Sequence, residues 1–259
     1  MLTKKEEKLI RGLQRQKIRQ EQAAFLAEGS KLVDDLLKSG MEPILLLCLE
    51  SRAAHYIELL PPSFRHLRIV EEAQLQKLST LQTANQLLAV FRQADPPSTD
   101  APLPDDFLLY LDGIRDPGNM GTILRLADWF GMRQILGSGD CVDIYNPKVV
   151  QASMGSLARV SFRPVPAAML QELAGGRPIL GSDMEGADMY SYSPPRDENV
   201  ILVIGNEARG IREEMQGLLK HKLRIPSYPT EPNGPRAESL NAAIAAAIFC
   251  AEFRRKSRH

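Results

Sequence analysis

Polar side chains that could take part in chemistry gather in three loops of this 259-residue chain, at 112–125, 203–211 and 224–241. They are amide, hydroxyl, carboxylate and guanidinium groups: Asn119, Arg125, Glu207, Arg209, Glu238, Ser239 and Asn241. Groups of these types can orient a substrate and assist the movement of a proton. They do not suggest a metal site, because the histidines His55, His66, His221 and His259 are isolated from one another. We therefore expect chemistry without a metal.

The first loop, DGIRDPGNMGTILR, combines a turn with the start of a helix. The Asp-Pro-Gly sequence at 116–118 favours the turn, and Asn119 is placed to cap the helix. Arg125 lies beside the apolar stripe of this helix, one turn after Gly121 on the same face. Helical side chains lean toward the N-terminus, so Arg125 should lie over the glycine, toward the end of the preceding strand. The alternative is a surface arginine on an amphipathic helix.

The second loop, VIGNEARGI, has a glycine at each end, Gly205 and Gly210. Two glycines allow the backbone to come close to a flat ligand, and Glu207 and Arg209 can face that ligand. The loop is not a phosphate loop, because no Gly-Lys-Ser/Thr sequence follows it. It also lacks the third glycine of a dinucleotide-binding fingerprint.

The third loop, RIPSYPTEPNGPRAESLN, has prolines and a glycine at its centre, which exclude regular structure there. Glu238, Ser239 and Asn241 bring hydrogen-bonding groups to the start of the next helix. That helix contains five alanines within 242–247, so another element can approach it closely. The alternative is a flexible loop before an ordinary alanine-rich helix.

The elements that must position these loops alternate between short apolar runs and helical patterns. The apolar runs are 107–111, 134–136, 179–181, 200–204 and 223–225, and the helical patterns are 120–130, 147–158, 165–173, 211–219 and 239–253. This alternation predicts an α/β fold, with a mostly parallel sheet covered by helices on both faces. Ligands of such sheets bind beyond the carboxyl ends of the strands, where the three loops lie.

A proline-rich and acidic segment, ADPPSTDAPLPDD at 94–106, lacks an apolar period and is predicted to be a linker. It separates a domain at 1–93 from a domain at 107–259. The first is predicted to be a small α/β domain. Its expected elements are a charged helix through about Ala27, a second helix at 32–38, and strands at 44–48, 67–70 and 87–91.

The charge balance bears on nucleic-acid binding. Lys and Arg number 32 and Asp and Glu number 32, and a neutral chain argues against contacts to phosphates. However, basic residues crowd the first twenty positions and the last six, either as a nucleic-acid contact or as solvated helix ends. The longest apolar run, 43–49, is too short to span a membrane, and the N-terminus is charged. We expect a cytoplasmic protein whose cysteines Cys48, Cys141 and Cys250 are reduced.

Taken together and in this order, the three loops resemble the three motifs of the SpoU/TrmH family (SPOUT class) of RNA 2′-O-ribose methyltransferases. The matching residues are Asn119, Gly121 and Arg125 in the first motif, Gly205, Asn206, Glu207, Gly210 and Ile211 in the second, and Ile225, Pro226, Ser239, Leu240 and Asn241 in the third. Segment 151–159 also resembles the family, and 25–33 and 78–91 are similar to its accessory substrate-binding domain. Two segments depart from the pattern: 83–86 replaces a Thr-Pro-Gln-Gly type turn, and 228–237 is longer and richer in proline.

The resemblance implies a deep trefoil knot in the second domain, S-adenosylmethionine as cofactor, an RNA substrate and a homodimer. The residues implied to bind the cofactor are Ser182, Gly205, Asn206, Gly210, Ile225, Pro226 and Leu240, with Asp183 as a neighbour. The residues implied to be catalytic are Arg125, Asn119, Glu207, Ser239 and Asn241. The accessory domain favours a structured RNA as substrate, and ribosomal RNA is favoured over transfer RNA.

The role of Arg125 is constrained by its chemistry. A guanidinium group has a pKa above about 12 and stays protonated, which makes it an awkward base. We therefore expect Arg125 to orient the nucleotide through a phosphate and to stabilise the developing alkoxide. Two other interpretations compete with this one: an RNA-binding protein of the same fold that has lost its activity, and a different α/β enzyme.

Overall fold

The structure is a computed structural model that describes residues 2–82, 85–98, 101–192, 199–228 and 238–257. The chain forms two compact units, Met1–Asp95 with Asp143–Arg159, and Pro96–Val142 with Val160–His259. The domain boundaries 1–93, 94–106 and 107–259 stay a prediction. By its contacts, segment 143–159 groups with the first unit rather than with the second.

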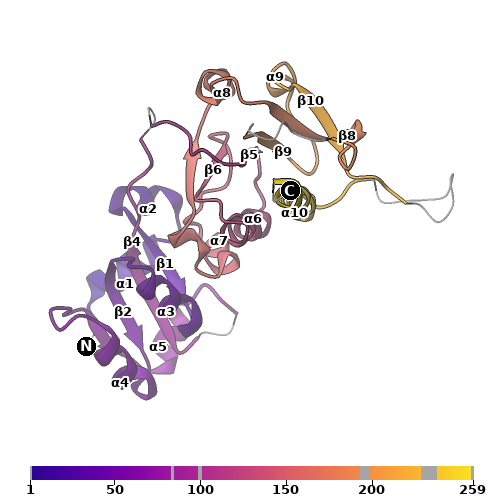
Figure 1. The fold of residues 1–259 in the computed structure, drawn as a ribbon. Coiled ribbons are helices and arrows are strands. Elements are labelled where there is room, and N and C mark those ends of the chain that lie inside the picture. Colours follow the sequence, from indigo (N-terminus) through magenta and orange to yellow (C-terminus); the bar gives the residue numbers. More distant parts are fainter. Residues whose placement is uncertain (1, 83–84, 99–100, 193–198, 229–237, 258–259) are drawn as a thin grey trace. The chain divides into compact units, whose positions relative to one another are not determined.

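The first unit is built on a four-stranded sheet in the order β1-β4-β2-β3 (Figure 1). Strands β1 (Ala24–Glu28) and β2 (Pro43–Cys48) are antiparallel to β4 (Leu87–Arg92), and β3 (Leu67–Ile69) is parallel to β2. The helices are α1 (Lys4–Gly12), α2 (Gln16–Gln22), α3 (Ser30–Lys38), α4 (Glu50–Leu59), α5 (Glu72–Leu78), α7 (Pro147–Ser153) and the 3-10 helix η1 (Ser156–Ala158). Leucine and valine side chains of β1, β2 and β4 form the centre of the core.

The expectation of one charged helix through about Ala27 was wrong. Helix α2 ends at Gln22, the following residue Ala23 has a φ of 44° in the left-handed region, and strand β1 begins at Ala24. All five residues of β1 are buried. A strand buried on both faces lacks the alternation of apolar and polar residues that marks a half-exposed strand, so its sequence does not distinguish it from a buried helical segment.

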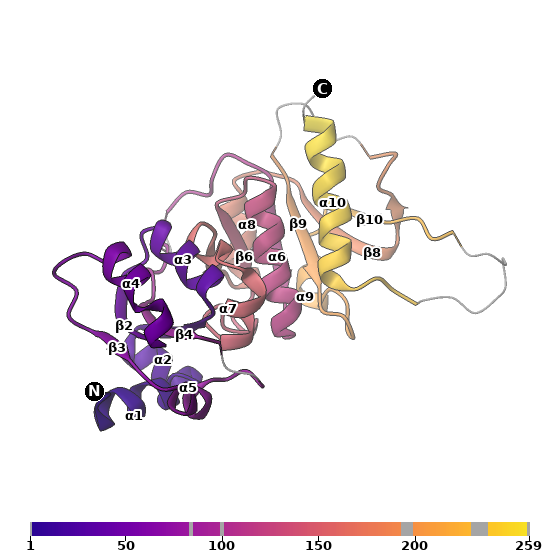
Figure 2. The ribbon, with the colours of Figure 1, turned by 90° about the horizontal axis from the view of Figure 1, so that it is seen from below.

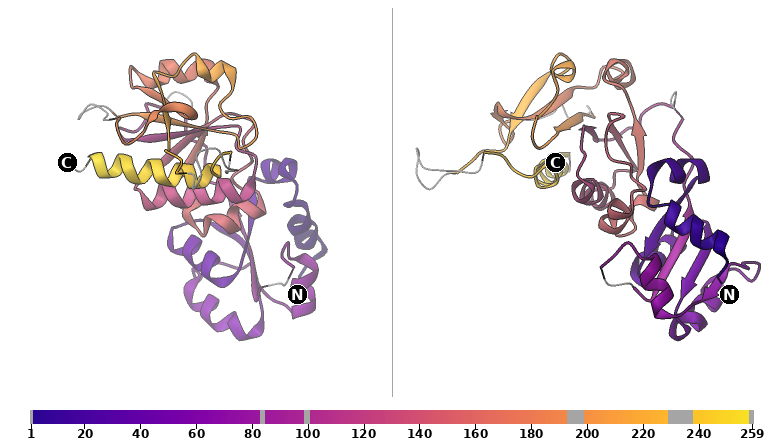
Figure 3. Two further views of the ribbon diagram at one scale, coloured as in Figure 1. Left: turned by 90° about the vertical axis from the view of Figure 1, so that its right-hand side faces the viewer. Right: turned by 180° about the vertical axis from the view of Figure 1, so that it is seen from behind.

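The second unit contains a six-stranded sheet in the order β10-β8-β9-β5-β6-β7, and all of its strand pairs are parallel. The strands are β5 (Leu108–Asp112), β6 (Gln134–Gly137), β7 (Ser161–Pro164), β8 (Ile179–Asp188), β9 (Ile201–Gly205) and β10 (His221–Arg224). Helices α6 (Pro117–Trp129) and α10 (Ala242–Ser257) pack side by side on one face (Figure 2). Helices α8 (Ala167–Ala174) and α9 (Glu213–Gln216) cover the other face (Figure 3).

The predicted α/β architecture is therefore confirmed, with differences in detail. Strand β7 was not predicted, and the helix expected at 211–219 shrinks to the single turn of α9. The helix expected at 147–158 divides into α7 and η1, because Met154 and Gly155 both have positive φ, 51° and 92°. Residues with positive φ cannot continue a right-handed helix.

The strands of the second unit are apolar throughout because both faces of the sheet are covered. All residues of β5 and all but the last of β9 are buried. Among the helices that the structure describes, none combines the length and the apolar character needed to cross a membrane. The three cysteines are free thiols, with Cys48 and Cys250 buried and Cys141 half-buried.

Candidate active site

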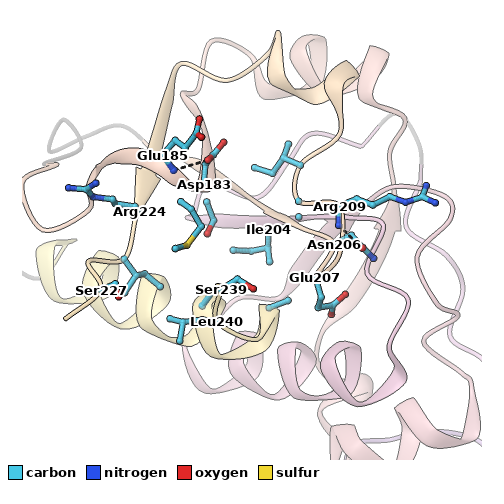
Figure 4. Close-up of a pocket in the computed structure, with 18 of the residues that line it drawn as sticks. Asp183, Glu185, Ile204, Asn206, Glu207, Arg209, Arg224, Ser227, Ser239 and Leu240 are labelled. Atoms are coloured by element: carbon cyan, nitrogen blue, oxygen red, sulfur yellow. Dashed lines mark hydrogen bonds between the residues drawn. The ribbon is translucent and has the colours of Figure 1, made fainter. Parts of the chain in front are cut away.

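A cleft of about 650 Å³ opens in the second unit at the carboxyl ends of β8, β9 and β10, beside the start of α10 (Figure 4). It is lined by residues 182–185, 204–207, 209–211 and 224–228, and by Gln216, Ser239, Leu240, Ala242 and Ala245. Its walls combine apolar side chains such as Ile204 with the carboxylates of Asp183, Glu185 and Glu207. The position agrees with the rule that parallel sheets bind ligands at this edge.

The loop after β9 closes on itself through two backbone hydrogen bonds. The N–H of Asn206 donates to the carbonyl oxygen of Gly210 at 3.1 Å, and the N–H of Gly210 donates to the carbonyl oxygen of Asn206 at 2.8 Å. The side-chain oxygen of Asn206 also accepts from the N–H groups of Ala208 and Arg209, at 3.0 and 3.3 Å. Gly205 is pressed against this turn, because a Cβ there would lie 2.4 Å from the carbonyl carbon of Gly210.

Asp112, the last residue of β5, anchors the same loop from the neighbouring strand. It is fully buried, and its carboxylate accepts from the backbone N–H of Arg212 at 2.8 Å and from Nε of Arg212 at 2.6 Å. The hydrogen bond to Asp112 raises the pKa of Arg212 above its ordinary value. Next to it, the carbonyl oxygen of Gly113 accepts from Nδ2 of Asn206 at 2.9 Å. Both ends of the loop are thus held by the end of β5.

One wall of the cleft is a bulge in β8. Lys222 of β10 pairs with Gly181, whereas Leu223 pairs with Ala187, so residues 182–186 leave the sheet. Within the bulge, Asp183 accepts from the backbone N–H of Glu185 at 3.0 Å and forms an ion pair with Nζ of Lys222 at 3.1 Å. Burial acts to raise the pKa of Asp183, but these contacts outweigh it and hold the pKa below its ordinary value. The cleft therefore carries a carboxylate anion at neutral pH. Figure 4 shows Asp183 beside Glu185 in the cleft.

The opposite wall comes from the third loop. Ile225 and Pro226, which follow β10, are half-buried, and Ser239 and Leu240, which precede α10, are exposed at the cleft. Leu240 keeps 45% of its surface exposed, which is unusual for a leucine beside a helix. The proline-rich stretch 229–237 lies outside the described residues, as do Thr83 and Ala84 of the other departing segment.

A chain of side-chain hydrogen bonds links the three loops. Asn119 is 8% exposed; its Nδ2 donates to Oε1 of Glu207, and its Oδ1 accepts from Nδ2 of Asn241 at 2.8 Å. The expectation that Asn119 caps α6 was wrong, because Asp116 is the N-cap and accepts from the N–H of Asn119 at 2.8 Å. Since Asp116 takes the capping role, the Asn119 side chain is free to make these long-range contacts.

Comparison with known proteins agrees with this geometry. A model of the SpoU rRNA methylase family matches residues 106–251, which is more than half of the chain. This chain belongs to the SpoU rRNA methylase family. Residues 5–89 in addition match a model of the MRM3-like substrate binding domain.

Individual members of the SpoU family are similar over most of their length. The 23S rRNA (guanosine(2553)-2′-O)-methyltransferase RlmP of Bacillus subtilis is 28% identical over 228 residues, covering 87% of this chain and 86% of RlmP. An RNA methyltransferase of the TrmH family from Porphyromonas gingivalis has a structure that matches with a TM-score of 0.86 and 36% identity, covering 98% of this chain and 99% of that one. The AdoMet-bound rRNA methyltransferase of Sinorhizobium meliloti matches with a TM-score of 0.84 and 28% identity, covering 98% and 96%.

The residues matched to the SpoU motifs fall into three groups in the structure. Those predicted to bind cofactor all line the cleft: Ser182, Gly205, Asn206, Gly210, Ile225, Pro226 and Leu240. Of the residues predicted to be catalytic, Glu207 and Ser239 line the cleft, Asn119 donates a hydrogen bond to Glu207, and Asn241 donates one to Asn119. Arg125 lies apart from them, exposed on α6 and absent from the lining of the cleft.

Some residues of the SpoU site were not predicted from the sequence. Asp112 and Arg212 hold the second loop, and Glu185 joins the cleft through the β8 bulge. The signal for Asp112 was present, since it is a carboxylate that directly follows the apolar run LLYL. The bulge leaves no local signal. Within the described ranges, no group of three His, Cys, Asp or Glu side chains is arranged to hold a metal ion.

Proposed function

We propose that this protein transfers a methyl group from S-adenosylmethionine to a ribose 2′-hydroxyl of a structured ribosomal RNA. The observation that carries the proposal is the cleft, which is lined by residues of the second and third SpoU motifs and is joined to Asn119 of the first motif by hydrogen bonds through Glu207 and Asn241. RlmP, which this protein matches over 86% of the length of RlmP, is named for 2′-O-methylation of 23S rRNA. This supports ribosomal over transfer RNA.

The cleft fits S-adenosylmethionine. Gly205 and Gly210 both line the cleft, and glycines offer backbone rather than side chain to a ligand, which suits contact with a flat adenine. Ile225, Pro226 and Leu240 offer apolar surface to that ring, and the carboxylates of Asp183 and Glu185 can accept from hydroxyl or ammonium groups. When bound, the cofactor supplies an electrophilic methyl group on a sulfonium.

Residues of this protein would align the accepting ribose hydroxyl and stabilise the negative charge that develops on its oxygen. The hydrogen bonds from Asn241 to Asn119 and from Asn119 to Glu207 hold the Glu207 carboxylate at the cleft. Correct alignment of reacting groups corresponds to effective molarities of roughly 10⁵ to 10⁸ M. Glu207 would orient the ribose, and Ser239 could hydrogen-bond beside it. The 2′-hydroxyl would lose its proton to a phosphate of the RNA, and Arg125, always protonated, would bind that phosphate and stabilise the developing alkoxide.

We infer that the enzyme is a homodimer in which Arg125 serves the cleft of the second copy. Trp129 follows Arg125 by one turn on α6 and is 83% exposed, and Ile244 on the adjacent α10 is 51% exposed. Exposed aromatic and aliphatic side chains on neighbouring helices are typical of a protein interface. Pairing of these helices between copies would bury both side chains and bring Arg125 toward a cleft.

The trefoil knot implied by the family also remains our proposal. It is supported by the match to the family model and by the close structural match to a TrmH-family RNA methyltransferase, with a TM-score of 0.86.

Methylation of RNA purified from cells that lack the gene tests the proposal. The pure protein, with S-adenosylmethionine labelled in its methyl group, should transfer label to 23S rRNA, and mapping of alkali-resistant linkages should find a single 2′-O-methylated nucleotide. Label confined to transfer RNA would contradict the ribosomal assignment. Tight cofactor binding by calorimetry without any transfer to RNA would contradict the enzymatic assignment.

A further inference from the structure

A second cavity, of about 1010 Å³, lies in the first unit, far along the chain from the SpoU motifs. We call it the basic groove, and its lining consists of Thr3, Lys4, Lys5, Glu6, Glu7, Lys8, Leu9, Arg11, Gly12, Arg15, Ile18, Gln22, Ile44, Leu45, His66 and Arg68. These residues come from α1, α2, the start of β2 and the segment around β3. The basic groove plays no part in the site described above.

Cations dominate the rim of the basic groove. Lys4, Lys5, Lys8, Arg11 and Arg15 are all exposed. Among the contacts of the described residues none of these five forms an ion pair, whereas Lys17 and Arg19 of α2 do, with Glu21 and Asp143. Of the two acidic residues of the lining, Glu6 is neutralised by Arg68 at 2.8 Å, which leaves Glu7 as a single opposing charge. The rim therefore has a large positive excess although the whole chain is neutral.

The floor of the basic groove is apolar and held in place. Leu9, Ile18 and Ile44 are partly buried and pack against the core of the first unit, and Leu45 belongs to that core. Gly12 allows α1 to approach this floor, since a Cβ there would lie 3.0 Å from Cγ2 of Ile18. The floor is thus a fixed apolar surface within a ring of positive charge.

The helices that form the rim are fixed by two ion pairs. Arg19, only 2% exposed, donates to the carbonyl oxygens of Leu13 and Gln14 at 2.9 and 3.0 Å and pairs with Asp143 at 2.7 Å. These bonds fix the turn between α1 and α2. The pair between Glu6 and Arg68 fixes α1 to the segment at β3. Because the groove is already formed, a ligand would not have to order it on binding.

We propose that the basic groove binds unpaired nucleotides of the substrate RNA. Phosphates would contact the cations of the rim, and unpaired bases would pack against the aliphatic side chains of the floor. A duplex would present its phosphates but keep its bases away from the floor. An anionic membrane is less suitable, because the apolar side chains form a half-buried concave floor and cannot insert into lipid. This inference rests on the proposed function and identifies which part of the RNA the first unit binds.

The test compares two triple variants of the full-length protein. Lys8→Ala/Arg11→Ala/Arg15→Ala removes three rim cations, and Lys17→Ala/Lys38→Ala/Lys77→Ala removes three exposed cations of the same unit that do not line the groove. Binding of a fluorescein-labelled RNA hairpin with a ten-nucleotide loop is measured by anisotropy at several salt concentrations. The groove variant should bind roughly tenfold more weakly, and the slope of log Kd against log salt should fall by about 2, as expected for three contacts to single-stranded phosphates. The control variant should bind like the wild type.

Further measurements distinguish a failure of this proposal from a failure of the proposed function. Methylation of 23S rRNA by the groove variant should show a raised KM with kcat at saturating RNA near that of the wild type, and calorimetry should give an unchanged Kd for S-adenosylmethionine. A fully paired RNA of equal length should compete at least tenfold less well than a single-stranded oligonucleotide. Equal competition, equal binding by the groove variant and the wild type, or binding of the groove to phosphatidylglycerol vesicles in place of RNA would overturn the proposal. Failure of the wild type to methylate any RNA would instead overturn the proposed function.

Discussion

Asn241 donates a hydrogen bond from Nδ2 to Oδ1 of Asn119 at 2.8 Å, although 122 positions separate the two residues. The Oδ1 of Asn241 meanwhile accepts from the backbone N–H groups of Ala243 and Ile244 at the start of α10, at 2.9 and 3.2 Å. The amide of Asn241 is therefore fixed by its own helix, and it in turn fixes Asn119. Because Asn119 donates to Glu207, the orientation of that carboxylate depends on both asparagines.

We expect Asn119→Ala to slow methylation more than it weakens cofactor binding. Loss of the amide leaves Glu207 without its donor and Asn241 without its acceptor, so kcat should fall by roughly tenfold to a hundredfold through misalignment. The Kd for S-adenosylmethionine, measured by calorimetry, should change less than threefold because Asn119 does not line the cleft. Thr122→Ala, on the exposed side of the same helix, is the control. An unchanged kcat in Asn119→Ala would remove Asn119 from the mechanism.

Arg125→Ala should nearly abolish methylation and leave the affinity for S-adenosylmethionine unchanged. The guanidinium group is exposed and outside the cleft, so its contribution is to the RNA and the transition state rather than to the cofactor. Arg125→Lys should recover little activity, because an ammonium group cannot bind a phosphate through two parallel hydrogen bonds. Single-turnover methylation of rRNA measures both variants, and full activity of Arg125→Ala would exclude the assignment.

Mixed dimers test whether Arg125 serves a neighbouring cleft. Arg125→Ala and Gly205→Ala subunits, assayed at a cofactor concentration too low to load the Gly205→Ala cleft, should each show little activity alone and should recover part of the wild-type activity when refolded together. In the mixed dimer one cleft has both an intact Gly205 loop and an Arg125 from the second copy. No recovery, with mixed dimers verified by mass spectrometry, would mean that Arg125 acts within its own subunit.

Gly205→Ala should weaken the binding of S-adenosylmethionine by at least about tenfold. A Cβ at this position would lie 2.4 to 2.7 Å from backbone atoms of Gly210 and Ile211, so the turn must move away from the cleft. Gly217→Ala is a matched control, because a Cβ there meets no atom within 4 Å. Calorimetry measures the two affinities, and thermal unfolding checks that both variants are folded. Wild-type affinity in folded Gly205→Ala would show that the close packing of this turn is not needed.

Glu252→Gln should lower stability at neutral pH and not at strongly acidic pH. Hydrogen bonds from Arg255 and Lys256, acting against burial, lower the pKa of Glu252 from 4.5 to about 2. A carboxylate whose pKa is lowered by folding stabilises the protein above its unfolded pKa and loses that effect as the pH falls toward its folded pKa. The difference in free energy of unfolding between wild type and variant should therefore be constant above about pH 5 and shrink between pH 4.5 and pH 2.

Urea unfolding at several pH values measures this difference. Glu172→Gln, on the exposed side of α8, is the control and should show a much smaller dependence. A difference between wild type and Glu252→Gln that grows at low pH would contradict the assigned ion pairs.

Local patterns predicted much of the molecule. The parallel strands were found because a sheet covered on both faces requires continuous apolar runs, and the two glycines of the second loop, predicted to face a ligand, line the cleft. The motif residues predicted to surround the cofactor all line one cleft. Strand β1 is also a continuous buried run, but it was missed, because a short buried apolar run next to a helix does not by itself distinguish a strand from a continuation of that helix.

By itself, then, the sequence of this protein determined its family, its fold class and the loops that form its cleft, because these depend on residue types at short spacing. Only the tertiary structure decided how the loops are held: by Asp112 binding Arg212, by Asn119 joining Glu207 to Asn241, and by the β8 bulge that brings Glu185 to the cleft. Each of these contacts joins residues that are distant in the chain or depends on strand register. The energy of such a contact exists only when the sheet has formed, so no local pattern of residues records it.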